Sequence, residues 1–213
     1  MKRISSLLTC VAIMASSCDH VEHSVNNDNK KDSTKKETAF VPVDSATAAK
    51  NWQAFMTPGE EHKMMASWNG NWKTETSVWM APGAPPQKGG GACVNSVILN
   101  GLYQQTKYTG NMMGMPFEGL GTMAFDNAKK IFISTWIDNM GSGLLKMEGT
   151  WDAATKSLKL SGTCTDPASG KDCTMREVYT VIDNNTHMME MYGPSPVDGK
   201  EMKTMEMKLT RTK

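Results

Sequence analysis

The chain lacks several features that would assign it a function directly. It has no apolar run of the roughly 20 residues that a membrane-spanning helix requires. Its 23 basic and 22 acidic residues leave no charge excess to attract nucleic acid. It has only four histidines, and the G-x-S-x-G, H-E-x-x-H, G-x-G-x-x-G and P-loop motifs are all absent. We therefore predict no catalytic residue, no metal site, no cofactor and no nucleic-acid partner.

The N-terminus has the pattern of an export signal. Lys2 and Arg3 precede the uncharged stretch Ile4–Ala15, which is too short to span a bilayer and is typical of a signal peptide. The residues Ala15-Ser16-Ser17-Cys18 resemble the lipobox of bacterial lipoproteins, although Ala15 stands where leucine is usual. The resemblance implies cleavage of residues 1–17 and lipid on the Cys18 thiol. An ordinary signal peptide without lipid is the alternative.

Residues 18–43 follow as a lipidated cysteine and a tether. Interleaved charges, asparagine and serine leave little apolar surface to bury, so we expect this segment to be disordered. His20 and His23 lie in it, and we interpret them as solvated because no rigid scaffold defines a metal site. Two or three acyl chains would hold the protein firmly at a membrane of the cell envelope. The predicted partner of the N-terminus is therefore a membrane, inner or outer.

The cysteines predict one disulfide bond. Of five cysteines, Cys10 leaves with the signal peptide and Cys18 carries lipid, so Cys93, Cys164 and Cys173 remain in an oxidising compartment. Turn signals between Cys164 and Cys173 predict a hairpin that places the two on neighbouring antiparallel strands. We predict a Cys164–Cys173 bond and a free, buried Cys93. Two unpaired thiols are the alternative.

Residues 44–213 have the pattern of a single all-β domain preceded by a short helical segment. Asp44 or Ser45 can cap a helix with Ala48, Trp52 and Met56 on one face, and Pro58 opens a second. Period-two alternation between turn signals then predicts about ten strands. They are 72–80, 92–99, 102–109, 117–125, 131–138, 143–151, 157–164, 173–182, 186–192 and 201–211. Short connections favour an antiparallel up-and-down barrel.

Several motifs occur in the order in which a known family has them. They are Pro58-Gly-Glu-Glu-His-Lys, Gly70-Asn-Trp72, Pro82-Gly-Ala-Pro-Pro86, Gly114-Met-Pro-Phe-Glu-Gly119, Phe125-Asp-Asn, Ser134-Thr-Trp-Ile-Asp138 and Asp198-Gly-Lys. In this order the chain resembles the DUF1579 family of bacterial proteins from about Met56 to Arg211. The resemblance implies a calycin-like barrel and raises the expectation of a ligand cavity, but it assigns no function. Gly101-Leu102 stands where the family's Gly-Arg is expected.

Candidate binding residues are aromatic and polar side chains on the predicted strands. A pocket with apolar walls and few polar groups is the usual small-molecule site. The candidates are Trp79, Tyr103, Gln104, Glu118, Trp136, Asp138, Arg176 and Tyr192. The alternative is that these side chains fill the barrel. His62 is expected on the surface, and His187 is expected to be packed or exposed, with a haem ligand as the lesser alternative.

Methionine is abundant, at 19 of 213 residues. We interpret it as a flexible core filler, and a Cu(I) site is the alternative. The leading hypothesis for function is a membrane-anchored, non-enzymatic binder of a small apolar ligand. Two alternatives stay open. One is a structural or protein-interaction lipoprotein of the cell envelope, which would use the barrel exterior or the Pro82–Gly91 loop. The other is an enzyme of unrecognised type.

Overall fold

The computed structural model describes residues 41–213. The predicted signal peptide, the Cys18 anchor and nearly all of the tether lie outside the described residues. No helix in the described part of the chain is long and apolar enough to cross a membrane.

The first helix, α1 (Ser45–Met56), begins where the sequence predicts it. The Asp44 carboxylate accepts hydrogen bonds from the backbone N–H groups of Ala46 and Thr47, each at 3.0 Å, and so caps the helix. Its apolar face does not pack as expected, because α1 buries no residue and Trp52 is 62% exposed. The side-chain amide of Asn127, in the turn after β4, donates to three carbonyls at the C-terminal end of α1.

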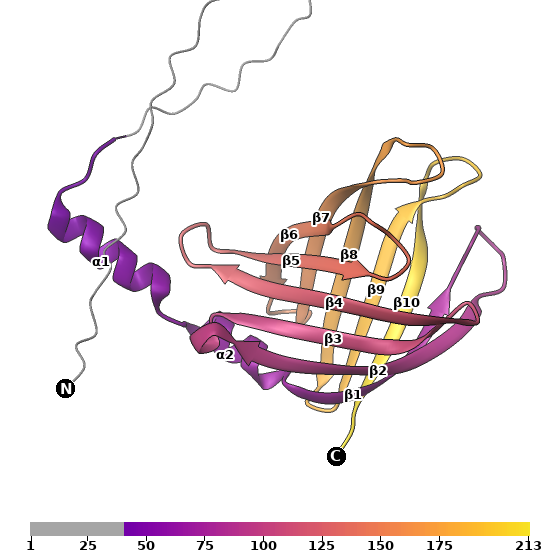
Figure 1. The fold of residues 1–213 in the computed structure, drawn as a ribbon, viewed down its shortest axis with the longest axis horizontal. Helices are drawn as coiled ribbons and strands as arrows, with labels where there is room; N and C mark the ends of the chain where they lie inside the picture. The colour runs from indigo at the N-terminus through magenta and orange to yellow at the C-terminus, as the bar shows by residue number, and fades with distance from the viewer. Residues whose placement is uncertain (1–40) are drawn as a thin grey trace, which may run out of the picture. The chain divides into compact units, whose positions relative to one another are not determined.

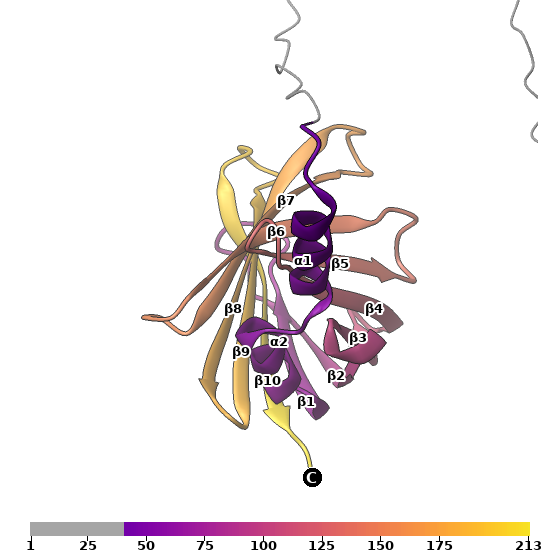
Figure 2. The same ribbon diagram turned by 90° about the vertical axis from the view of Figure 1, so that its left-hand side faces the viewer.

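The second helix, α2 (Glu60–Ser67), closes one end of the barrel (Figure 2). Met65 in α2 and Trp68, the residue after the helix, are 0% and 3% exposed. The apolar side of α2 is therefore buried against the strands. Trp72 Nε1 donates to the Trp68 carbonyl at 3.0 Å, and the side-chain amide of Gln104 donates to the Met65 carbonyl. The Met65 carbonyl also accepts the Trp68 N–H at 3.0 Å, so these side chains add barrel contacts to the end of the helix.

Ten antiparallel strands form a closed barrel, as the sequence predicts (Figure 1). Each strand pairs with its neighbours in the chain, and β1 pairs with β10 to close the barrel, with Trp72 opposite Arg211 and Val78 opposite Met205. Closure leaves no free sheet edge. The strands are Gly70–Val78 (β1), Gln87–Ile98 (β2), Tyr103–Met112 (β3), Met115–Asp126 (β4), Ile131–Asp138 (β5), Leu145–Asp152 (β6), Ser157–Thr165 (β7), Asp172–Asp183 (β8), Thr186–Pro194 (β9) and Glu201–Arg211 (β10).

Several strand bounds differ from the prediction by one to three residues, and the largest difference lies at a run of glycines. β2 begins at Gln87 rather than Ala92, so Gly89, Gly90 and Gly91 belong to the strand and not to a loop. A Cβ atom at Gly90 would collide with the Thr74 carbonyl of β1, and one at Gly91 with the Thr109 carbonyl of β3. The glycines therefore permit close approach of backbone at a bend in the barrel wall.

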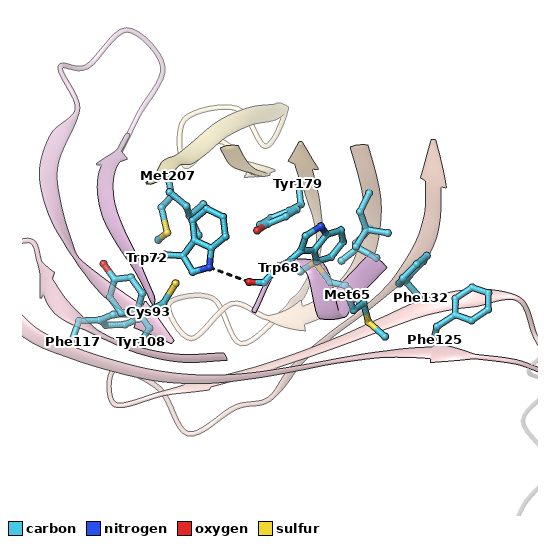
Figure 3. Packing of buried hydrophobic residues seen from close by; sticks show 14 residues of the cluster. Met65, Trp68, Trp72, Cys93, Tyr108, Phe117, Phe125, Phe132, Tyr179 and Met207 are labelled. Atoms are coloured by element: carbon cyan, nitrogen blue, oxygen red, sulfur yellow. Dashed lines mark hydrogen bonds between the residues drawn. The ribbon is translucent and has the colours of Figure 1, made fainter. Parts of the chain in front are cut away.

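Buried apolar side chains of α2 and the strands form the core (Figure 3). Trp72, Phe132 and Leu158, which lie near the α2 end of their strands, are each no more than 1% exposed. The Trp68 and Tyr179 rings lie 5.3 Å apart by their centroids. This packing forms a solid floor, and the strands continue beyond it.

Candidate functional site

A cavity of about 990 Å³ occupies the barrel above this floor. Trp68 and Tyr179 form its base, and side chains of β2 to β10 form its wall. The β5–β6 loop contributes Met140 and Leu144, which are 40% and 60% exposed, so the cavity reaches the surface at the end opposite α2. Its volume lies at the upper end of the range found for small-molecule sites.

The wall of the cavity is rich in methionine. Met147 and Met207 are only 2% and 7% exposed, which confirms that methionine replaces other apolar residues in the barrel interior. Unbranched, polarisable methionine side chains adapt to ligands of different shape. The cavity-lining methionines are Met112, Met123, Met140, Met147, Met189, Met191, Met205 and Met207.

Glu177 of β8 is the unusual polar group in this wall. It is 8% exposed, lines the cavity and lies opposite Leu160 of β7 and Met191 of β9. Among residues 41–213 its carboxylate has no hydrogen-bond or ion-pair partner and borders the cavity. Burial raises the pKa of Glu177 from its ordinary 4.5 to about 7, because the charged form loses its hydration.

Sequence reasoning missed Glu177 and selected its neighbour Arg176. Arg176 points to the outside, where its guanidinium donates to the Glu201 carboxylate at 3.1 and 2.9 Å and stacks 3.9 Å from the centre of the Tyr192 ring. A signal was available in the alternation of β8. Glu177 shares its face with Met175 and Tyr179, so a charged residue occupies an otherwise apolar inward series.

Three of the predicted binding residues, Gln104, Trp136 and Asp138, do line the cavity. Trp136 Nε1 donates to the Asp138 carboxylate at 2.9 Å. The Trp136 ring lies flat on β4, where a Cβ atom at Gly119 would collide with it. The Gln104 side-chain amide donates to the Met65 carbonyl of α2 at the base of the cavity, so this donor already has a partner within the protein.

The other predicted residues lie away from the cavity. Besides Arg176 and Tyr192, Glu118 is exposed and Tyr103 is 36% exposed. Trp79 borders a separate shallow hollow of about 410 Å³ on the outer surface, where the Lys203 ammonium is 5.9 Å from its ring centre. The reason is the two-residue period of the strands, which sends every second side chain outward.

Both histidines of the barrel domain are packed. His187 is 1% exposed, its Nδ1 lies 2.6 Å from the Tyr179 hydroxyl, and its ring centre is 4.4 Å from that of Trp72. Burial lowers the pKa of His187 to about 4. His187 does not line the cavity, which removes the basis for a haem ligand there. The expectation of a surface His62 is wrong: it is 2% exposed, and its Nδ1 accepts the Gly59 N–H at 3.0 Å.

Cys164 and Cys173 are opposite each other on β7 and β8, as the hairpin prediction requires. Their Sγ atoms are 3.5 Å apart, and the structure has them as free thiols, so the bond itself stays a prediction. Cys93 is free and 2% exposed, as expected, and burial raises its pKa to about 11.

These features define a class: a closed up-and-down β-barrel with one end plugged by a helix and a ligand-sized interior cavity open at the other. The chain belongs to the DUF1579 family, whose model, described as a protein of unknown function, matches residues 57–211. No curated protein matches the chain.

Among solved structures, the chain is similar to the crystal structure of Rv2717c from M. tuberculosis. The TM-score is 0.56 at 12% identity, over 74% of this chain and 100% of that chain. At this identity the likeness supports the fold alone.

Proposed function

We propose that this protein is a membrane-anchored binding protein that holds a small, mainly apolar molecule in its barrel. The observation that carries the proposal is the cavity of about 990 Å³. A barrel of this kind can instead be filled completely by its own side chains. Here the filling stops at the floor formed by Trp68 and Tyr179, and methionine and aromatic side chains border the space above it.

Binding is favoured over catalysis by the chemistry of the wall. Glu177 is a buried carboxyl with a raised pKa, which a general base requires. A catalytic site also needs a nucleophile or a second acid-base group within hydrogen-bond reach. Among residues 41–213 no such group hydrogen-bonds to Glu177, and no group of three or more His, Cys, Asp or Glu side chains in that range could hold a metal ion.

A pair of matched variants tests the proposal. Ser134 lines the cavity from β5, whereas Ser161 is exposed on β7. Ser134→Phe should fill part of the cavity and weaken binding of the neutral dye Nile red at least about tenfold, while Ser161→Phe should leave binding unchanged. Equal affinity in both variants would place the dye elsewhere and refute the interior site. Native mass spectrometry of the protein purified from its host should then identify the resident ligand.

The anchor part of the proposal rests on the sequence before the described residues. Cys18→Ser should abolish acylation and move the protein from the membrane fraction to the soluble fraction. Mass spectrometry of the mature N-terminus measures the lipid directly. An unlipidated wild-type protein, or a variant that remains in the membrane, would contradict the anchor.

A further inference from the structure

The charged side chains that line the cavity are all acidic. They are Asp138, Asp172 and Glu177, and no lysine, arginine or histidine of residues 41–213 shares the wall with them. A ligand that carries a carboxylate or phosphate would find no positive partner here and would be repelled. The charge of the wall therefore disfavours anionic lipids, including fatty-acid anions.

Within the described part of the chain, only one of the three carboxyls has no hydrogen-bond or ion-pair partner. Asp138 accepts from Trp136 Nε1 and from the Met140 backbone N–H, both at 2.9 Å. Asp172 accepts from the Thr165 hydroxyl at 2.9 Å. Glu177 lies deeper, is more than nine-tenths buried, faces the cavity, and has no hydrogen-bond or ion-pair partner in the described chain.

An unpaired buried carboxyl is costly to the fold. Burial without a partner is unfavourable for any polar group and most unfavourable for a charge. An apolar side chain at this position would pack against Leu160 and Met191 without that cost. Residues that reduce stability in this way are typical of functional sites, where a ligand supplies the missing partner.

Aromatic rings line the same cavity as Glu177 and would contact a ligand group that pairs with its carboxylate. Tyr179 follows Glu177 on the same face of β8, and the Trp68 ring lies 5.3 Å from that of Tyr179. Tyr108, Phe117 and Trp136 also line the cavity. The faces of aromatic rings attract organic cations, and the attraction increases when water is excluded.

We propose that the cavity binds a lipophilic amine, whose ammonium group pairs with the Glu177 carboxylate and whose hydrocarbon part lies against the methionine and aromatic wall. This inference rests on the proposed function and specifies its ligand class. The ammonium group supplies hydrogen-bond donors to a carboxylate that has none, and its charge replaces the lost hydration.

Three C12 probes with different head groups test the inference: dodecylamine, dodecanol and dodecanoate, each below its micellar concentration. Their affinities are measured at pH 8 by displacement of Nile red from the full-length protein. Dodecylamine should bind at least about tenfold more tightly than dodecanol, since one charge-assisted hydrogen bond has that effect. Dodecanoate should bind most weakly.

Two variants assign the preference to one residue. Glu177→Gln keeps the shape of the side chain and should reduce the amine-to-alcohol ratio to about one, with dodecanol affinity unchanged, which also shows that the variant is folded. Glu75→Gln removes an exposed carboxylate from the outer face of β1 and should preserve the ratio.

The outcomes separate this inference from the proposal on which it rests. A dodecanoate affinity equal to that of the amine, or an amine preference that persists in Glu177→Gln, overturns the amine assignment while the binding function stands. Failure of Nile red and of all three probes to bind overturns both.

Discussion

Replacing Glu177 with glutamine should stabilise the barrel, and the gain should depend on pH. The side chain is 8% exposed and has no partner in the described residues, and its pKa is raised from 4.5 to about 7. The pKa of Glu177 is higher in the folded state than in the unfolded state. The contribution of Glu177 to stability is therefore greatest below about pH 4.5, where the carboxyl is neutral in both states. This stability is lost as the pH rises through about 7. A glutamine is neutral throughout and loses nothing.

The size of the effect follows from the pKa shift. Each unit of pKa difference between the folded and unfolded states is worth about 1.4 kcal/mol. The shift at Glu177 therefore corresponds to about 3 kcal/mol above pH 7 and to nearly nothing below pH 4.5. This is a large part of the stability of a typical domain, which is roughly 5–15 kcal/mol.

Urea unfolding of wild type and Glu177→Gln at pH 4.5, 6, 7 and 8 measures the difference. Neighbouring groups do not confuse it: the pKa values of Tyr179 and Cys93 are raised, so both stay neutral in this range, and His187 titrates equally in both proteins. Glu75→Gln is the control for simple charge removal and should show no such pH-dependent gain. A Glu177→Gln variant that is less stable than wild type at pH 8 would refute the reasoning, because it would mean that the carboxylate makes stabilising contacts.

Three further predictions follow from the described structure. In the Glu177→Gln background the free energy of unfolding should fall by up to about 3 kcal/mol as the pH drops from 6.5 through 4, because His187 is buried in its neutral form and has a pKa of about 4. His187→Asn should remove this pH dependence, and a pH dependence that survives the substitution would assign it to another group. Oxidation should join Cys164 to Cys173, whose Sγ atoms are 3.5 Å apart, and the closed short loop should raise the free energy of unfolding by about 2–3 kcal/mol. Peptide mapping without reductant would contradict the pairing if it found both thiols free or a peptide linked through Cys93. Titration with Cu(I) should show no sub-micromolar affinity. A sub-micromolar affinity that disappears when leucine replaces Met112, Met113 and Met115 would show that these methionines form a metal site.

The strand pattern could be predicted because each strand carries its own evidence. Leu158 and Leu160 alternate with polar residues, and both are buried in the barrel, at 0% and 1% exposure. Alternation of this kind and the turn residues between strands are local properties of the chain. The hairpin register that places Cys164 opposite Cys173 was predictable for the same reason.

Which side chains face the cavity was predicted less well, because residue type does not reveal on which side of the barrel wall a side chain lies. Arg176 and Glu177 are neighbours in the chain, yet one pairs with Glu201 outside and the other faces the cavity. His62 looked solvated between two charged residues, but the turn of α2 carries it inward against Phe125, with ring centres 5.9 Å apart. Helix and strand periodicity show which residues share a face, but the packing partner of that face must be known before its residues can be assigned to the interior or to the surface.

The sequence by itself determined the fold class, the approximate number of strands and the family, since these depend on local periodicity and on motifs read in order. The membrane anchor stays a prediction from the sequence alone. Only the tertiary structure decided that the barrel is hollow. Whether ten strands enclose a packed core or a cavity depends on how side chains from opposite walls meet, and Trp68, His187 and Tyr179 meet only at the closed end. Closure of the barrel likewise placed Glu177 in the cavity wall with no hydrogen-bond or ion-pair partner among residues 41–213, because the absence of a partner depends on all the surrounding strands together.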